Sequence, residues 1–135
     1  MRTSLSTTCR RPRVALLGEI AHAELTDAIA RLRSTAEVLP ADSVADAELI
    51  VLAQSRPGVF AARDVDRLRR DSPLASFVAL LGTWCEGELR TGRPLADVRR
   101  IYWYDFPHWW LRQLTMWNAG RFPDWARPEE VATTV

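Results

Sequence analysis

The residues best suited to nucleophilic chemistry in this sequence are a cysteine and two histidines. Cys85 follows an apolar run and could pair with His22 or His108, since a histidine beside a thiol can take its proton and create a nucleophile. No glycine-rich turn precedes Cys85, and a cysteine in such a place is more typical of a buried, unreactive side chain. The cysteine and histidine spacing also matches no zinc site and no disulfide framework. The pattern therefore predicts no catalytic residue and no bound metal.

Arginine supplies every basic side chain of the chain. The 135 residues include 18 basic residues and none is lysine, which excludes Schiff-base chemistry and a P-loop lysine. The formal net charge of +1 argues against a dedicated nucleic-acid-binding protein. No apolar run reaches the roughly 20 residues that cross a bilayer. We therefore expect a cytoplasmic protein that needs no cofactor and binds neither nucleic acid nor membrane.

Strands and helices alternate along the chain. Short apolar runs predict strands at 14–17, 36–39, 49–53 and 76–81, and a β-branched and aromatic run predicts a fifth at 98–104. Helical spacing predicts helices at 19–33, 61–70 and 107–118, with a loop or short helix at 41–48 and an irregular segment or one helical turn at 83–95. This alternation indicates an α/β protein with a parallel sheet between two helical layers, and right-handed crossovers favour the flavodoxin-like order 2-1-3-4-5.

The domain is expected to span 13–119, after a tail at 1–12 and before a C-terminal extension at 120–135. The tail is rich in arginine and serine and lacks the apolar core of a signal peptide, so it reads as a disordered tail or an organelle transit peptide.

Polar side chains follow several of the predicted strands. In a doubly wound sheet, ligands bind at the carboxyl ends of the strands, where Glu19, Gln54, Ser55 and Thr83 would gather. One hypothesis is therefore a small-molecule sensor or minor enzyme that uses this cleft. The polar segment 83–88 could line it together with Glu19 and Arg90, or could be a solvated loop.

The strand sequences also resemble a known family. LIVLAQSRPG is similar to the third strand and following turn of response-regulator receiver domains, where a phosphorylated aspartate ends the strand four residues before a Pro-Gly turn. VALLGEIA, VALLGT and YDFP resemble the first, fourth and fifth strand ends of that family. The resemblance covers about residues 13–118 and is weakest at 84–97. The alternative is a flavodoxin-like domain that has converged on the same order of elements.

The resemblance implies a receiver that has lost its chemistry. The acidic pair of the family falls on Gly18 and Glu19, the phosphoacceptor on Ala53, the hydroxyl residue on Thr83 or Gly82, and the lysine on Phe106. Aspartyl phosphorylation needs a nucleophilic carboxylate and a divalent ion, and one glutamate is a poor magnesium site. Such pseudo-receivers are thought to act through protein contacts or by binding something other than phosphate. A receiver that uses a different acceptor is a third hypothesis.

Aromatic residues crowd the last third of the chain. Helical spacing places Trp110, Leu111, Leu114 and Trp117 toward the sheet. The other side of the last helix would then carry a candidate interface made of Trp109, Arg112, Gln113 and Met116. Exposed Trp, Met and Arg are typical of interfaces, so we expect a protein partner or a homodimer through this helix. Alternatively, the segment 122–125 folds back and covers it.

Overall fold

The computed structural model describes residues 10–87, 95 and 97–126. In these residues five strands form one parallel sheet in the order β2-β1-β3-β4-β5. The strands are β1 (Arg13–Gly18), β2 (Glu37–Leu39), β3 (Leu49–Gln54), β4 (Ser76–Leu81) and β5 (Arg99–Tyr102). The helices are α2 (Thr26–Thr35), α3 (Ala62–Asp71) and α5 (Phe106–Asn118), with 3-10 turns η1 (Ala23–Leu25), η2 (Ala41–Asp46), η3 (Thr83–Gly87) and η4 (Asp124–Ala126). The predicted α/β flavodoxin-like fold and its strand order 2-1-3-4-5 are confirmed.

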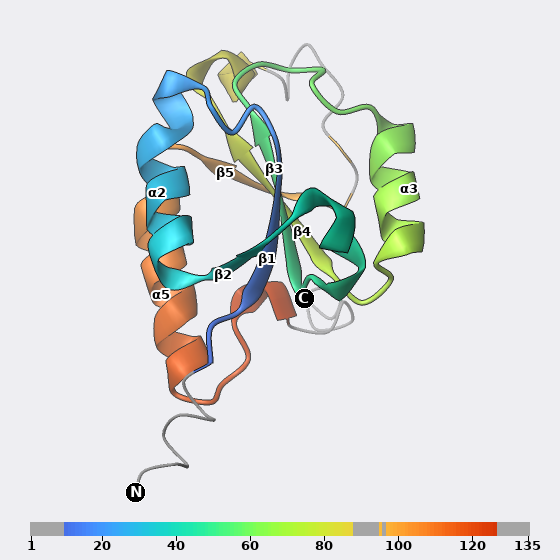
Figure 1. The fold of residues 1–135 in the computed structure, drawn as a ribbon. Helices are drawn as coiled ribbons and strands as arrows, with labels where there is room; N and C mark the ends of the chain where they lie inside the picture. The colour runs from blue at the N-terminus through green and yellow to red at the C-terminus, as the bar shows by residue number, and fades with distance from the viewer. Residues whose placement is uncertain (1–9, 88–94, 96, 127–135) are drawn as a thin grey trace, which may run out of the picture.

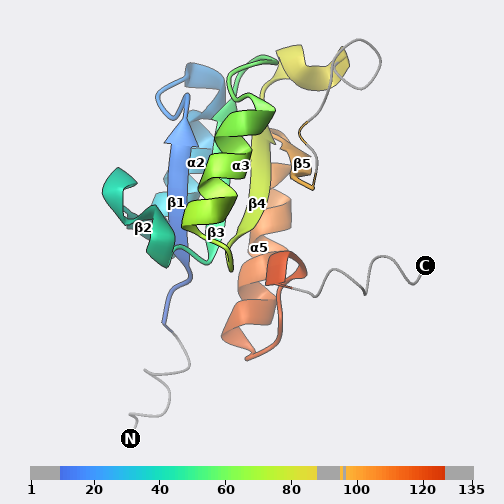
Figure 2. The ribbon, with the colours of Figure 1, turned by 90° about the vertical axis from the view of Figure 1, so that its right-hand side faces the viewer.

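The sheet is the middle layer of three. α2 and α5 lie side by side on one face, and α3 covers the other (Figures 1 and 2). Successive strand residues alternate between the two cores: Leu16 and Val51 pack under α2 and α5, whereas Ile50 and Leu52 face α3. Because β3 is buried on both faces, its sequence is an unbroken apolar run rather than an alternating one.

The first helix begins later than its periodicity predicts. α2 starts at Thr26, and the preceding residues form a loop and the turn η1. His22 caps η1, because its Nδ1 accepts a hydrogen bond from the backbone N–H of Glu24 at 3.1 Å. The prediction of helix for 19–25 is therefore wrong: polar side chains in this stretch form capping and long-range hydrogen bonds in place of a regular helix.

Smaller differences occur near β5. The strand ends at Tyr102 rather than at residue 104, since the N–H of Asp105 turns back to the carbonyl of Tyr102 at 2.9 Å. The stretch 83–95 contains η3, in line with one short helical turn, while 88–94 lie outside the described residues. None of the helices in the described chain is both long and apolar enough to cross a membrane.

The two edges of the sheet carry different elements. η3 lies at the carboxyl edge, where the strands end, and η4 lies at the amino edge, where they begin (Figure 2). The hydroxyl of Ser76, at the start of β4, donates a hydrogen bond to the carbonyl of Trp125 in η4. Arg10 also lies at the amino edge, and its carbonyl accepts a hydrogen bond from the Trp117 indole. Both ends of the described chain therefore lie at the amino edge.

Candidate functional site

Glu19 directly follows β1, and its carboxylate reaches the segment after β3. Its Oε1 accepts hydrogen bonds from the hydroxyl and the backbone N–H of Ser55, at 2.6 and 2.8 Å. Its Oε2 lies 3.5 Å from a guanidinium nitrogen of Arg56. The Ser55 hydroxyl, the Ser55 N–H and the nearby Arg56 charge together hold the pKa of Glu19 below its ordinary value. Glu19 is therefore ionised at neutral pH and already occupied by donors of the chain itself.

A second carboxylate makes the same kind of bond one strand further along the sheet. Glu24, in η1, accepts hydrogen bonds from the hydroxyl and the backbone N–H of Thr83, at 2.6 and 3.0 Å. The Thr83 hydroxyl is the main reason that the pKa of Glu24 is lowered. Sequence analysis did not single out Glu24, because its partner lies 59 residues away and the residue was assigned to a helix.

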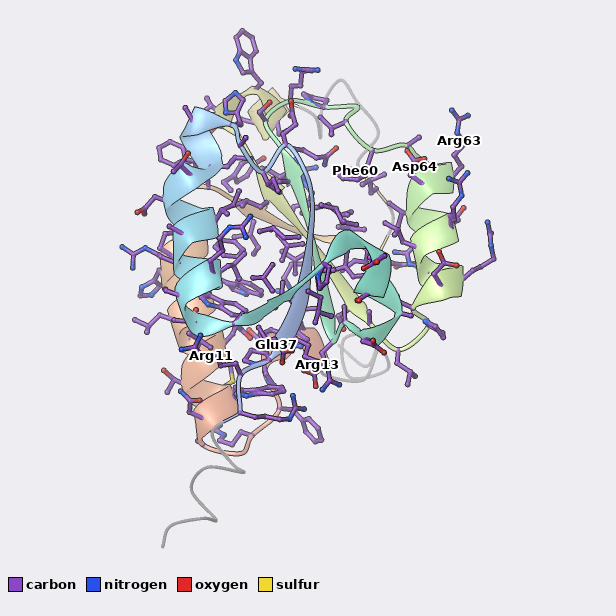
Figure 3. The ribbon with its side chains drawn as sticks, viewed as in Figure 1. Arg11, Arg13, Glu37, Phe60, Arg63 and Asp64 are labelled. Atoms are coloured by element: carbon purple, nitrogen blue, oxygen red, sulfur yellow. The ribbon has the colours of Figure 1, made fainter. Side chains whose placement is uncertain are left out.

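Glycines allow these loops to approach the sheet closely. Gly18 has a positive φ of 98°, and a Cβ placed there would lie 2.5 Å from the carbonyl oxygen of Ala53 and 2.7 Å from the Phe60 ring. Phe60 lies in the loop that leads from β3 into α3, near Asp64 (Figure 3). A Cβ on Gly82 would lie 2.5 Å from Glu24 Oε1 and 2.7 Å from the carbonyl oxygen of Ser55. The carboxyl edge is therefore closely packed around its two carboxylates.

The residues assigned from the receiver resemblance are buried or hydrogen-bonded within the chain. Ala53 is fully buried at the end of β3, and its carbonyl accepts the N–H of Glu19 at 2.9 Å. Phe106 is also fully buried and belongs to the core under α2 and α5. Thr83 is engaged with Glu24, as well as with the Trp103 indole at 3.0 Å. The described residues include no group of three or more His, Cys, Asp or Glu side chains that could hold a metal ion.

Gln54 and Cys85 at this edge also have partners within the chain, whereas Arg90, the other predicted cleft residue, lies outside the described residues. Gln54 is buried, and its side-chain oxygen accepts the N–H of Phe60 at 3.3 Å. Cys85 is fully buried, with its sulfur 3.6 Å from the carbonyl oxygen of Gln54. His22 uses its Nδ1 to cap η1, and His108 is exposed on α5. A buried thiol is typical of a structural cysteine rather than of a nucleophile.

One prominent residue of this edge was not singled out from the sequence. Trp84 lies in η3 and is 80% exposed. The turn on which it lies is held on both sides: Trp103 donates to the Thr83 hydroxyl at 3.0 Å, and the Tyr104 hydroxyl donates to Glu86 at 2.8 Å. The bond to Glu86 raises the pKa of Tyr104 to about 12. The only sequence signal was a tryptophan inside an otherwise polar segment.

The predicted interface on the last helix is wrong for Trp109 and Gln113, which are buried. Arg112 is exposed and Met116 is half-buried, so these four residues form no continuous exposed stripe. Trp109 packs in the core against Phe106 and Trp125, whose ring centroids lie 5.5 and 6.4 Å from its own.

The alternative, in which the segment after the helix folds back, is confirmed. Trp125 also stacks on Trp110 and Trp117, with centroids 5.4 and 6.1 Å apart. The Gln113 amide accepts the backbone N–H of Asp124 at 2.7 Å and donates to its carboxylate at 3.2 Å. Leu111, predicted to face the sheet, is 62% exposed instead, whereas Trp110 is buried and Leu114 and Trp117 pack against the core as predicted.

Comparison of the chain with protein-family models, with curated proteins and with solved structures found no significant match in any of the three.

Proposed function

We propose that this chain is a non-catalytic protein-binding module of receiver-like architecture that acts in cytoplasmic signalling. The observation that carries the proposal is Trp84, a large apolar side chain that is 80% exposed on a turn fixed at both ends. Tryptophans held in this way are common anchors of protein interfaces, because little conformational entropy is lost when they are covered. The recognition surface is accordingly the carboxyl edge around Trp84.

The chemistry of this edge supports binding over catalysis. Glu19 and Glu24 are each bonded to a hydroxyl and a backbone N–H, so neither has its carboxylate free for a substrate. The phosphoacceptor position of a receiver is the methyl group of Ala53, which cannot act as a nucleophile. Cys85 is buried and is part of no disulfide among the described residues, which fits a reducing compartment such as the cytoplasm.

The charge of the surface favours a partner that presents arginine or lysine. Glu86 and Asp105 lie in the same turns as Trp84 and Tyr104. A guanidinium group can stack on an exposed indole and pair with a carboxylate at the same time. A symmetric dimer through this surface would instead bring the acidic residues of two copies together, which like-charge repulsion disfavours.

The proposal can be tested by fluorescence anisotropy with a labelled peptide of alternating arginine and alanine. We expect saturable binding that weakens with added salt and falls about fivefold or more in Trp84→Ala. The matched control is Leu111→Ala, which removes another exposed apolar side chain, on α5 rather than on η3, and should bind like the unmodified protein. A peptide of alternating glutamate and alanine controls for unspecific binding.

Two results would contradict the proposal. If the acidic peptide bound equally well, the preference for a cationic partner would be contradicted. If Trp84→Ala bound as the unmodified protein does, Trp84 would not be the anchor of the surface. Light scattering on a sizing column would give the oligomeric state, and we expect a monomer. A stable dimer that dissociates in Trp84→Ala would replace the cationic partner by a second copy of the chain.

A further inference from the structure

A groove lies at the amino edge of the sheet, on the side of the molecule opposite to Trp84. Its volume is about 860 Å³, within the range of small-molecule sites. It runs between the loop before β4, which contributes Leu74, and the segment from α5 to η4, which contributes Arg121 and Phe122. Arg10, Arg13 and Glu48 line it from the side of β1 (Figure 3 shows Arg13 at the start of that strand).

The groove contains positive charge for which residues 10–87, 95 and 97–126 provide no matching negative charge. Arg10 is committed to Glu48, with contacts of 2.8 and 3.2 Å between its two terminal nitrogens and the two carboxylate oxygens. Burial alone would raise the pKa of Glu48, but its bonds to Arg10 and to the N–H of Arg13 lower it, so this pair stays charged and closed. Arg13 donates from its Nε to the carbonyl of Asp46 at 3.0 Å, and its terminal nitrogens have no hydrogen-bond partner within the described ranges.

Arg121 is the cation available to a ligand. Its backbone N–H closes α5 by donating to the carbonyl of Met116 at 2.8 Å, which fixes the position of the residue. No acceptor for its guanidinium group is found among the described residues, and the side chain is exposed. The lining thus holds three guanidinium groups against two carboxylates, those of Asp46 and Glu48, a net charge of +1.

The same groove has apolar walls that face water. Leu74 is 96% exposed and Phe122 is 74% exposed, and both line the groove. The rings of Trp117 and Trp125 line it as well. Large apolar side chains around a concave surface gain free energy when a ligand removes them from water. The lining therefore combines Arg121, a cation without a side-chain acceptor in the described part of the chain, with apolar walls that could cover a small organic molecule.

We propose that this groove binds small organic anions that carry an apolar body, with the anionic group on Arg121 and Arg13 and the apolar part between Leu74 and Phe122. Inorganic anions should bind weakly because they make no apolar contact with the walls. Neutral apolar molecules should also bind weakly because they provide no acceptor for Arg121. The proposal concerns the amino edge only and stands apart from the protein-binding surface around Trp84.

The test uses 8-anilinonaphthalene-1-sulfonate, a fluorescent aromatic anion, with the folded chain of 135 residues near pH 7. We expect a saturable rise in fluorescence. Arg121→Gln should weaken binding about tenfold, as expected for the loss of one hydrogen bond to a charged group. Phe122→Ser should weaken it several-fold through lost apolar contact. Both residues are exposed, so both variants should unfold at the same denaturant concentration as the unmodified protein.

The matched controls are Arg112→Gln and Leu111→Ser, an exposed arginine and an exposed leucine on α5 that do not line the groove. They should bind the probe as the unmodified protein does. Decanoate should displace the probe, and inorganic phosphate at the same concentration should not. The proposal is overturned if binding is not saturable, if Arg121→Gln and Phe122→Ser weaken it no more than the controls do, or if phosphate competes as well as decanoate.

Discussion

Trp125 should contribute more to stability than its place near the end of the described chain suggests. Its side chain is 6% exposed and packs against three other tryptophans, with ring centroids 5.4 to 6.4 Å away. Replacing a buried tryptophan by alanine costs roughly 3–5 kcal/mol of unfolding free energy, because buried apolar surface is lost and a cavity remains. We therefore predict a marked destabilisation in Trp125→Ala.

The lower end of that range is expected here. The bond from Ser76 to the carbonyl of Trp125 and the paired bonds between Gln113 and Asp124 do not involve the indole. In the variant these bonds should keep η4 attached to β4 and α5. A small inward shift of η4 would then fill part of the cavity. About 3 kcal/mol is still a large part of the roughly 5–15 kcal/mol that holds a domain folded.

Urea unfolding followed by far-ultraviolet circular dichroism measures this loss directly. Phe122→Ala is the matched control, since Phe122 is a neighbouring aromatic residue that is exposed, and we expect a change within about 0.5 kcal/mol. If Trp125→Ala lost less than about 1 kcal/mol, as little as the control, the packing of η4 on α5 would be refuted. Trp125→Ala should also uncover Trp109 and so self-associate more readily on a sizing column.

Three further results are expected. Gly18→Ala should lower the unfolding free energy by about 2 kcal/mol or more, against about 1 kcal/mol for Gly58→Ala. Both glycines have a positive φ, but of the two only Gly18 lacks room for a Cβ. Thermal unfolding of the two variants would measure the difference. Glu19 and Glu24 have a lower pKa in the folded chain than their ordinary 4.5, so their stabilisation is present above that pH and is lost as the pH falls through their folded values. The double variant Glu19→Gln and Glu24→Gln should accordingly lose less stability between about pH 5 and 3 in urea titrations, and an unchanged pH profile would contradict this assignment. Treatment with acetyl phosphate and magnesium should add no phosphoryl group to the intact mass, since Ala53 offers no nucleophile; a gain of one phosphoryl group would point to a different acceptor.

The sheet could be predicted because its signal is local. Apart from Gln54 at the end of β3 and Ser76 at the start of β4, both strands are apolar, which is the pattern of strands buried on both faces. Their order follows from connections of limited length and fixed handedness. The residues that follow these strands, Ser55 and Thr83, were also placed at the correct edge.

The surfaces could not be predicted in the same way, because they depend on partners far along the chain. Helical spacing alone assigned Leu111 to the core and Trp109 to solvent, whereas the folded chain buries Trp109 against Phe106 and Trp125 and leaves Leu111 exposed. Glu24 could not be predicted for a related reason, since its role comes from a hydrogen bond to Thr83, which follows β4. Periodicity reports which residues share a face of a helix, but not which face a later segment will cover.

The position of the two chain ends sets the direction in which this domain faces the rest of any larger assembly. Arg10 and η4 both lie at the amino edge, and Trp84 lies at the opposite edge (Figure 1 shows η3 and η4 at opposite ends of the sheet). A tag, a linker or a fused protein joined to either end of the described chain would therefore be attached near the groove and far from Trp84. In surface-capture experiments, anchoring by either end should leave Trp84 facing the solution, whereas the amino-edge groove would face the support.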